Sequence, residues 1–408
     1  MEHTPLRQAA EEVVDVLRQA GHVALFAGGC VRDMLMGRSP TDIDIATDAP
    51  PDRVVLLFRR TRQVGAKFGV VLVHWHGHEM EVATFRTESD YADHRRPGKV
   101  AFTTAQEDAK RRDFTINGMF YDPFADEVID YVGGGDDLAA RRVRAIGVPD
   151  ERFSEDHLRM LRAVRFAARF GFELETATLD AIRRNASQIR TISSERVRME
   201  IEQILLDPSR ASGWGLLRRT GLSLHLVEGL HWTDVEADTA ARRLTALPNT
   251  VTFPLAAAAL LVSHGPRTAR ESCLRLRFST AEMDAVVWLL TQLPRAAATE
   301  TLDLADVRLL LADPRFSDLT ALLLADLISR DVSPAPHALL LERAARVAPA
   351  QAVPPPLLTG DDLMAMKLPP GPRYGLILDQ VYRAQLNEEI RDHEAALAMA
   401  RQLWSDRK

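Results

Sequence analysis

The feature that most constrains the fold is a change of pattern near residue 150. The first part of the chain, about 140 residues, holds short runs of β-forming residues between turn residues: HVALFAGG, TDIDIAT, GVVLVHW and EMEVATF. Helical patterns precede Ala24 and cover Pro51 to Arg59. From about Arg152 onward, Leu, Ala, Arg and Glu recur at helical spacing. The sequence therefore predicts an α/β or α+β head followed by an all-helical remainder of about 250 residues.

Turn residues and prolines divide the chain further. Residues 132–147 are rich in glycine, and Asp207 precedes a proline, which disfavours helical backbone at that position. Proline-rich stretches at 333–336 and 353–356 predict linkers or rigid turns. No repeat of fixed period occurs. We expect four parts: a head at 1–143, a neck at 144–209, a body at 210–330 and a tail at 331–408.

Composition excludes several classes of protein. The chain is 46% hydrophobic and 26% charged, which is enough apolar material for a core and argues against intrinsic disorder. No apolar run approaches the length of about 18 residues that a membrane helix needs, and the first residues lack a secretion signal. Cys30 and Cys273 cannot alone build a disulfide framework or a zinc site. These observations predict a cytoplasmic protein that does not enter a membrane.

Two aspartates are the first candidates for chemistry. In Asp42-Ile43-Asp44, a strand would place both carboxylates on one face and leave Ile43 and Ile45 for the core. Carboxylates that close repel each other unless a cation lies between them, and Mg²⁺ prefers such hard oxygen ligands together with a substrate phosphate. Taken alone, the triplet is a weak signal, because D-x-D occurs often by chance and more commonly marks a solvated strand end than a metal site.

A glycine pair precedes the aspartates. Gly28 and Gly29 follow the apolar run Ala24–Ala27 and come before a helical stretch that carries Arg32. Glycines at a strand-to-helix turn let the backbone approach a ligand closely, and an arginine there adds a donor for phosphate. A tight turn with a surface Arg32–Asp33 pair is the simpler alternative.

Together, G-G-x-V-R-D and the later D-I-D resemble the first motif of the nucleotidyltransferase superfamily that includes DNA polymerase β. The similarity is greater to class II tRNA nucleotidyltransferases (CCA-adding enzymes) and bacterial poly(A) polymerases. This resemblance implies an α+β head with a mixed sheet and an all-helical neck, body and tail. It implies that Gly29 and Arg32 hold a nucleoside triphosphate and that Asp42 and Asp44 hold Mg²⁺. It also implies a third catalytic carboxylate, for which Glu81 in EMEVATF is the best match.

Two later segments extend the resemblance. Arg111-Arg112-Asp113-Phe114-Thr115-Ile116-Asn117 combines donors and acceptors that suit phosphate and ribose, and it matches the family's second motif, in which Arg112 would bind the triphosphate. The segment that starts at Glu155 fits an amphipathic helix with Ser154 as its N-cap and a Glu155–Arg159 ion pair.

That helix also matches the family's EDxxRxxR element. By this resemblance, Asp156 accepts a hydrogen bond from the exocyclic amine of cytosine or adenine, and Arg159 donates to the base. Arg162 and Arg165 would serve the phosphates or the fold. The resemblance covers about half of the chain, residues 20–210. A weaker similarity to the tail of bacterial family members lies in Thr359-Gly360-Asp361-Asp362-Leu363.

The resemblance implies template-independent addition of C, C and A to the 3′ acceptor end of tRNA from CTP and ATP, with release of pyrophosphate. The charged loop at 86–97 argues against a member that adds only C, and Ala66 departs from the basic pattern of poly(A) polymerases. Addition of A alone stays open, as does poly(A) synthesis. A catalytically inactive RNA-binding protein and a small-molecule nucleotidyltransferase are more remote alternatives.

Two further expectations concern partners and added domains. No His-Asp dipeptide occurs, so we expect no metal-dependent phosphohydrolase domain of the kind that some family members carry. The sequence leaves open whether the chain is a monomer or a homodimer. Candidates for contact with the tRNA backbone are arginines of the helical part: Arg183, Arg184, Arg218, Arg219, Arg242, Arg243, Arg267 and Arg270.

Overall fold

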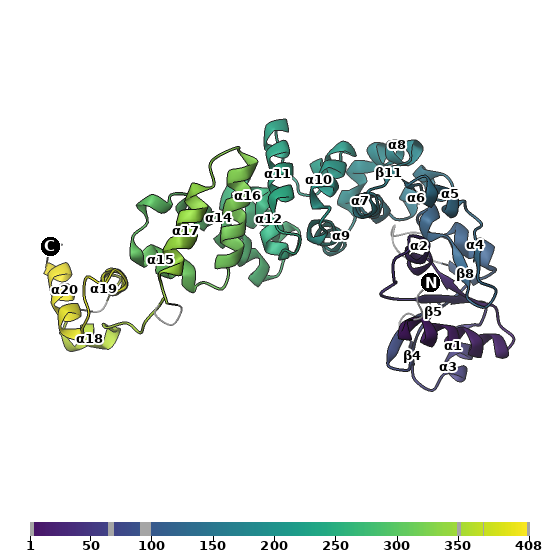
Figure 1. Cartoon of the computed structure of the whole chain (residues 1–408), viewed down its shortest axis with the longest axis horizontal. Coiled ribbons are helices and arrows are strands. Elements are labelled where there is room, and N and C mark those ends of the chain that lie inside the picture. The colour runs from purple at the N-terminus through teal and green to yellow at the C-terminus, as the bar shows by residue number, and fades with distance from the viewer. Residues whose placement is uncertain (1–3, 64–68, 90–98, 349–351, 370, 406–408) are drawn as a thin grey trace. The chain divides into compact units, whose positions relative to one another are not determined.

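The computed structural model describes residues 4–63, 69–89, 99–348, 352–369 and 371–405 (Figure 1). The chain forms two compact units, Met1–His231 and Trp232–Lys408. The finer division into head, neck, body and tail stays a prediction. Across the described ranges, no helix combines the length and the apolar character that a membrane crossing requires.

A mixed seven-stranded sheet forms the centre of the first unit, in the order β3-β4-β5-β2-β1-β8-β9. β2 and β5 run parallel, and the other neighbouring strands run antiparallel. The four strand segments predicted from the sequence correspond to β1, β2, β4 and β5, so the predicted α+β class with a mixed sheet is confirmed. The strands are β1 (Ala24–Ala27), β2 (Asp44–Thr47), β3 (Thr61–Gln63), β4 (Val70–Trp75), β5 (His78–Thr84), β8 (Phe120–Asp122) and β9 (Glu127–Ile129).

Both faces of the sheet are covered. Phe26 of β1 and Ile45 of β2 share one buried cluster with Leu17 of α1 (Pro5–Gln19) and Val54 of α3 (Pro51–Leu57). The alternate residues of β1 face a second cluster, which includes Ala109 of α4 (Ala105–Lys110). Because successive side chains of a strand point to opposite faces, a strand buried on both sides is apolar throughout, as ALFA of β1 is.

Helices follow the sheet, as predicted. The remaining helices of the first unit are α2 (Gly29–Leu35), α5 (Gly134–Ala139), α6 (Pro149–Glu155), α7 (Leu158–Phe170), α8 (Thr176–Asn185), α9 (Ser194–Leu206) and α10 (Arg210–Arg219). α9 ends directly before Asp207, whose extended backbone agrees with the proline that follows it. The only strand after residue 150 in the described part of the chain is β11 (Glu173–Leu174), which pairs with β10 (Arg142–Val143).

Two features differ from the sequence expectations. The segment expected as a loop at 86–97 begins as a strand, because β6 (Arg86–Ser89) pairs with β7 (Lys99–Phe102). The proline-rich stretch at 333–336 is not a linker throughout. It enters α17, and its last proline lies in the first turn of that helix, where the missing N–H has no partner to lose.

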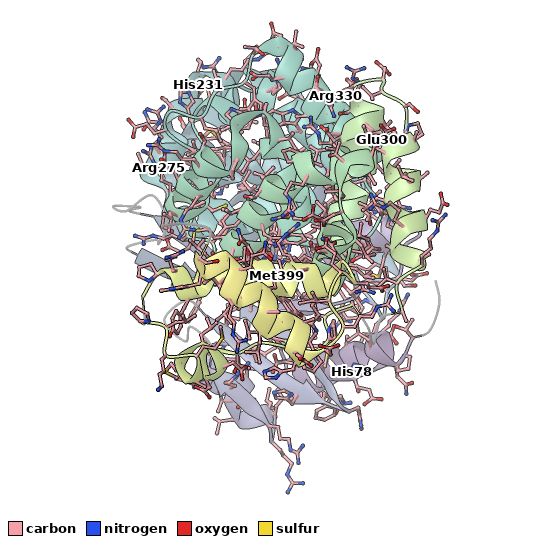
Figure 2. All side chains as sticks on the ribbon, turned by 90° about the vertical axis from the view of Figure 1, so that its left-hand side faces the viewer. His78, His231, Arg275, Glu300, Arg330 and Met399 are labelled. Carbon is pink, nitrogen blue, oxygen red and sulfur yellow. The ribbon has the colours of Figure 1, made fainter. Side chains whose placement is uncertain are left out.

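The second unit is helical throughout its described residues. Its helices are α11 (Asp234–Ala246), α12 (Phe253–Leu261), α13 (Gly265–Arg275), α14 (Thr280–Ala297), α15 (Leu304–Ala312), α16 (Phe316–Ser329), α17 (Ala335–Ala345), α18 (Gly360–Ala365), α19 (Arg373–Leu386) and α20 (His393–Ser405). Thr359 and Asp362 form a capping box at the start of α18. Met399 lies on α20 (Figure 2) and packs against a separate C-terminal cluster that includes Leu363 and Val381.

One of the candidate arginines for tRNA contact is buried instead of exposed. Arg243 is 3% exposed and forms an ion pair with Asp326 at 2.9 Å, while its Nη1 donates to the carbonyl of Ala259. Arg330 shares the same aspartate, with its Nη2 2.6 Å from Oδ2. An arginine enclosed in this way holds helices together and does not present its charge to RNA.

Candidate active site

The turn between β1 and α2 requires glycine. Gly28 has a φ of 77°, a region that side chains with a Cβ rarely adopt. A Cβ at Gly28 would also lie 2.8 Å from Nη1 of Arg112. The turn at Gly28 therefore lies beside a guanidinium from a different part of the chain, and Gly29, which follows it, starts α2.

Asp42 and Asp44 enter the site from the start of β2. The strand begins at Asp44, so Asp42 lies in the segment that leads into it rather than in the strand itself. Ile43 and Ile45 are 2% and 0% exposed, as the alternation predicted. The two carboxylates line the same cavity.

Glu81 lies on the neighbouring strand. β2 and β5 are parallel with Ile45 opposite Val82, so Asp44 and Glu81 occupy equivalent positions, one residue earlier on each strand. Equivalent positions of a parallel pair share a face of the sheet. Glu81 lines the same cavity as the two aspartates.

These carboxylates create a strongly negative wall. Burial, together with the charges of Glu81 and Asp42, raises the pKa of Asp44 to about 6. A divalent cation would relieve this repulsion. Within the described residues, no three His, Cys, Asp or Glu side chains form a complete metal-binding group. Mg²⁺ does not need one, because it commonly uses one or two carboxylates together with water and substrate phosphates, so the donor set fits such an ion.

Arg32 is held firmly behind the turn. It is 5% exposed, its Nη1 donates to Oδ1 of Asn117 at 2.5 Å, and its Nη2 forms an ion pair with Asp33 at 2.8 Å. Its guanidinium also lies over the rings of Phe166 and Phe170. The predicted Arg32–Asp33 pair exists, but it is an internal contact of the site rather than a surface pair.

Arg111 and Arg112 follow the end of α4 and share one buried acid. Asp108 accepts from Nε of Arg111 at 2.7 Å and from Nη2 of Arg112 at 3.1 Å. Nη1 of Arg112 also donates to the carbonyl of Asn117. Both arginines line the cavity with the glycine turn, so the segment RRDFTIN contributes a positive wall to the site.

The EDHLR segment is not a single helix. α6 ends at Glu155, Asp156 is extended with φ −150° and ψ 102°, and α7 begins at Leu158. The prediction that Ser154 caps this helix is wrong, since Ser154 lies inside α6 and its hydroxyl donates to the carbonyl of Glu151. The break turns the carboxylate of Asp156 away from the path of a continuous helix.

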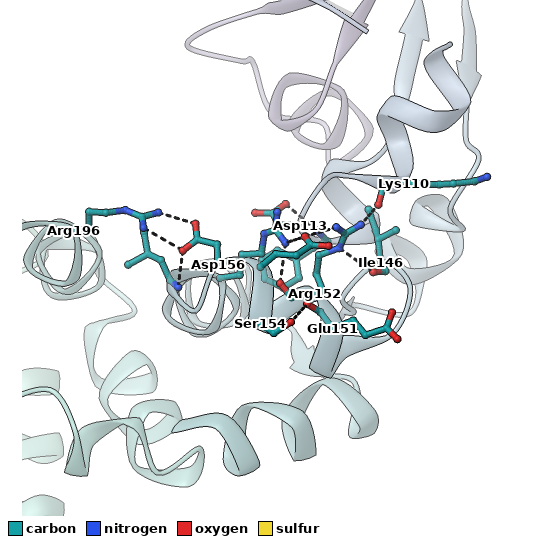
Figure 3. A network of polar contacts seen from close by, with 12 residues as sticks. Lys110, Asp113, Ile146, Glu151, Arg152, Ser154, Asp156 and Arg196 are labelled. Atoms are coloured by element: carbon teal, nitrogen blue, oxygen red, sulfur yellow. Dashed lines mark hydrogen bonds and ion pairs between the residues drawn. The ribbon is translucent and has the colours of Figure 1, made fainter. Parts of the chain in front are cut away.

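The two residues expected to contact the base are both held in place by neighbouring side chains, and Figure 3 shows this for Asp156. Arg159 forms the predicted ion pair with Glu155 and donates to the carbonyl of Arg152 at 2.8 Å. Asp156 forms an ion pair with Arg196 of α9, with Nη2 of Arg196 and Oδ2 of Asp156 at 2.7 Å. Each of the two side chains therefore lies in the cavity with one orientation specified by its neighbours.

Arg162 and Arg165 link α7 to other elements. Nη2 of Arg162 donates to Oδ2 of Asp113 at 2.7 Å, and Nε of Arg165 donates to Glu200 of α9 at 2.7 Å. Both also lie over the ring of Phe166. These contacts tie both arginines to the fold, and both also border the cavity, so the expectation that they serve the phosphates or the fold stays a prediction with both alternatives open.

The ten residues expected to serve catalysis, metal binding or nucleotide binding all line one cavity of about 670 Å³. The sequence analysis missed Arg169 and Arg196, which also line it. Arg169 follows Arg165 by four positions and Arg162 by seven, which places the three arginines on one face of α7, so helical spacing could have identified it. Arg196 gives no such signal, because it reaches the cavity from a different helix.

Two segments that bear on substrate choice lie outside the described residues. These are most of the expected loop at 86–97, from residue 90 onward, and the stretch 64–68 that contains Ala66. The distinction between CCA addition and related activities that was based on them stays a prediction.

Comparison with known proteins places these elements in a family. The family model described as "Poly A polymerase head domain" matches residues 24–144, and that described as "Probable RNA and SrmB-binding site of polymerase A" matches residues 171–232. The first range contains the sheet and both walls formed by the carboxylates and by RRDFTIN.

Two curated relatives are both named CCA-adding enzymes. The chain is 46% identical over 223 residues to the CCA-adding enzyme of Geobacillus thermodenitrificans, covering 54% of this chain and 55% of that protein. It is 48% identical over 194 residues to the CCA-adding enzyme of Bacillus subtilis, covering 47% and 49%. These alignments span about half the length of the curated relatives.

Solved structures extend the similarity over the whole chain. The Bacillus stearothermophilus CCA-adding enzyme, in complex with CTP, matches with a TM-score of 0.81 and 32% identity over 99% of both chains. A CCA-adding enzyme in complex with ATP matches with a TM-score of 0.74 at 20% identity, over 98% of this chain and 95% of that one, and shows the same fold. With this similarity in sequence and fold, the chain belongs to the family of CCA-adding enzymes.

Proposed function

We propose that this protein adds C, C and A to the 3′ end of tRNA, without a template, from CTP and ATP. The observation that carries the proposal is the single cavity in which the carboxylates of Asp42, Asp44 and Glu81 face the arginines and Asp156. Family membership supports it, since the relatives are named CCA-adding enzymes. The reaction joins the 3′-hydroxyl oxygen to the α-phosphorus of the nucleotide and releases pyrophosphate and a proton.

The carboxylate wall supplies the metal site of the proposed reaction. Membership of this nucleotidyltransferase family implies a divalent metal, and we propose Mg²⁺, held by Asp42 and Asp44 with Glu81 nearby. The metal would position the hydroxyl against the α-phosphate and stabilise charge on the attacking and leaving oxygens. The charge of Glu81 on Asp44 favours occupation by a cation.

The opposite wall would hold the triphosphate. Gly29 offers backbone at the turn, and Arg112 offers a guanidinium whose position Asp108 fixes. Arg32 is tied to Asn117 and Asp33, so it would act on the phosphates from a fixed position. Preorganised donors of this kind cost little reorganisation during the reaction.

Asp156 and Arg159 would read the base in place of a template. A carboxylate accepts hydrogen bonds, so it suits the exocyclic amines of cytosine and adenine, whereas uracil and guanine place a carbonyl oxygen at the equivalent position. Arg159 would donate to the ring. A contact of this bidentate kind discriminates by about 1–3 kcal/mol, which favours CTP and ATP over UTP and GTP.

The test is primer extension with Mg²⁺ on tRNA transcripts that end at the discriminator base, after one added C, and after two. Each nucleotide is supplied alone, CTP and ATP are supplied together, and the 3′ ends are sequenced. We expect CCA and nothing further on the shortest transcript. Addition of A alone to the CC-ended transcript would show an A-adding enzyme, and long A tails would show a poly(A) polymerase.

Variants of the two aspartates test whether they are the metal ligands of the reaction. Asp42→Ala and Asp44→Ala should each abolish incorporation, because each removes a proposed metal ligand, while thermal unfolding reports whether they remain folded. Activity retained by both folded variants would contradict the assignment. Replacement of Mg²⁺ by other divalent ions, after chelation, measures which metal the site uses. No incorporation by the unmodified protein would favour the RNA-binding alternative.

A further inference from the structure

Arg196 lies outside every motif of the sequence analysis, yet it contacts the proposed base-reading acid (Figure 3). Its Nη2 donates to Oδ2 of Asp156 at 2.7 Å, and its Nη1 donates to Oδ1 at 3.2 Å. We propose that Arg196 is a positioning residue that determines nucleotide specificity by fixing which oxygen of Asp156 faces the incoming base. This inference rests on the proposed function.

The hydrogen bonds of Asp156 show which acceptor site remains. A carboxylate has about four lone-pair sites, two on each oxygen. Among the described residues, Oδ1 accepts from Nη1 of Arg196 and from the backbone N–H of Leu158 at 3.1 Å. Oδ2 accepts from Nη2 of Arg196. The contacts of the described residues thus leave one acceptor site on Oδ2, which matches the single amine that cytosine or adenine would present.

The pair is enclosed enough for its geometry to matter. The side chains of Arg196 and Asp156 are 19% and 15% exposed, and both line the cavity. Two planar groups joined by two parallel hydrogen bonds have one relative orientation, which a lysine could not impose. Removal of the guanidinium would let the carboxylate rotate about its side-chain bonds.

α9 provides a rigid base for Arg196. Val197 and Ile201 of this helix are 4% and 5% exposed, and α9 packs on α7. Arg165 and Glu200 join the two helices by a further ion pair at 2.7 Å. Because α7 also carries Arg159, the donor and the acceptor that read the base are fixed to the same pair of helices.

The expected loss is therefore one of discrimination. A carboxylate that rotates can turn its charge away from the carbonyl oxygen of uracil or guanine, so the penalty against UTP and GTP falls. It also loses its alignment with the amine of the correct base, so the KM for CTP and ATP rises. A loss of fold or of the metal site would instead reduce kcat/KM for all four nucleotides by the same factor.

The experiment compares Arg196→Met, Arg196→Lys and the control Arg198→Met in the full-length protein. Arg198 lies on the same helix, is 20% exposed, pairs with Glu202 and does not line the cavity. We expect Arg196→Met to lower the ratio of kcat/KM for CTP over UTP at least tenfold, mainly through the KM for CTP. Arg196→Lys should lower this ratio less than Arg196→Met does, and Arg198→Met should leave it at the value of the unmodified protein.

A double variant tests the route through Asp156. If Arg196 acts by orienting this acid, it has no further effect once the acid is removed. The ratio of kcat/KM for CTP over UTP should then be the same for the double variant Asp156→Asn, Arg196→Met as for Asp156→Asn alone. An equal decrease in kcat/KM for all four nucleotides would overturn the proposal, and so would decreases in selectivity that multiply in the double variant.

Equilibrium binding of CTP and UTP with Mg²⁺ gives a readout without turnover. An unmodified protein that adds neither C nor A to tRNA would refute the proposed function, whereas equal effects of Arg196→Met on CTP and UTP binding would refute this inference.

Discussion

Gly28 controls how closely Arg112 approaches the β1–α2 turn. Its φ of 77° and ψ of −127° suit glycine alone, and a Cβ would lie 2.8 Å from Nη1 of Arg112. We predict that Gly28→Ala destabilises the protein by about 1–3 kcal/mol through backbone strain. It should also reduce kcat/KM, because the guanidinium must move. Denaturant unfolding and primer extension measure the two effects.

Gly215 provides the matched control. It lies in α10 without a positive φ, and no atom outside its own helical neighbourhood lies within 4 Å of the position that a Cβ would occupy. Gly215→Ala should therefore stabilise the protein by about 0.5–1 kcal/mol and leave activity unchanged. A Gly28→Ala variant that is as stable and active as the parent would show that the turn tolerates a side chain.

Single residues also mark the limit of prediction from sequence. Asp42, Glu81 and Arg112 could be identified because each lies in a short motif with a characteristic spacing. Arg196 could not, since 40 positions separate it from Asp156 and only the packing of α9 on α7 brings the two together. A contact made by tertiary packing leaves no local pattern in the chain.

Between elements, the ion pair of Asp113 and Arg162 joins the head motif to α7. Burial alone would raise the pKa of Asp113. The charge of Arg162 and the hydrogen bonds from Asn117 and Phe114 have the larger effect, and they lower this pKa to about 2. A carboxyl with a lowered pKa in the folded state stabilises the fold above its unfolded pKa of 3.8. This contribution, about 2 kcal/mol, is lost as the pH falls from 4 toward 2.

We predict that Asp113→Asn lowers the free energy of unfolding by about 2 kcal/mol at pH 6. The difference from the parent should shrink by about half at pH 3, because the parent's own contribution is then being lost. Urea unfolding of both proteins between pH 3 and pH 6 measures it. Comparing the two proteins at each pH cancels the titration of the other carboxyls. A difference that does not change with pH would show that the charge of Asp113 is not its source.

The break between α6 and α7 shows why elements are predicted less well than motifs. The segment that starts at Glu155 has continuous helical spacing, so the sequence predicts one helix. In the structure, Asp156 is extended, while Arg196 pairs with its carboxylate and Arg152 donates to the carbonyls of Ile146 and Lys110. Tertiary contacts outweigh local helix propensity at this position.

Across the whole molecule, the change of pattern near residue 150 predicts the order of sheet and helices correctly. The division into two compact units at residue 231 has no matching signal, because the sequence on both sides is helical. Helical periodicity reports which face of a helix is buried, but it does not report which helices share a core. Buried apolar clusters in the structure supply that information, as in the C-terminal cluster around Leu363.

The last prediction follows from the location of the site. All ten candidate residues belong to the first unit, and each unit has its own buried core. A ligand that binds only the folded state stabilises the unit that holds it, by about 2.7 kcal/mol at a hundred times its Kd. In calorimetry we expect two unfolding transitions. CTP with Mg²⁺ should raise the midpoint temperature of only one of them, the transition of the first unit. Asp44→Ala should abolish that shift and leave the second transition unchanged. A single transition, or an equal shift of both, would mean that the two units unfold together, since only coupled unfolding passes the binding energy of one unit to the other.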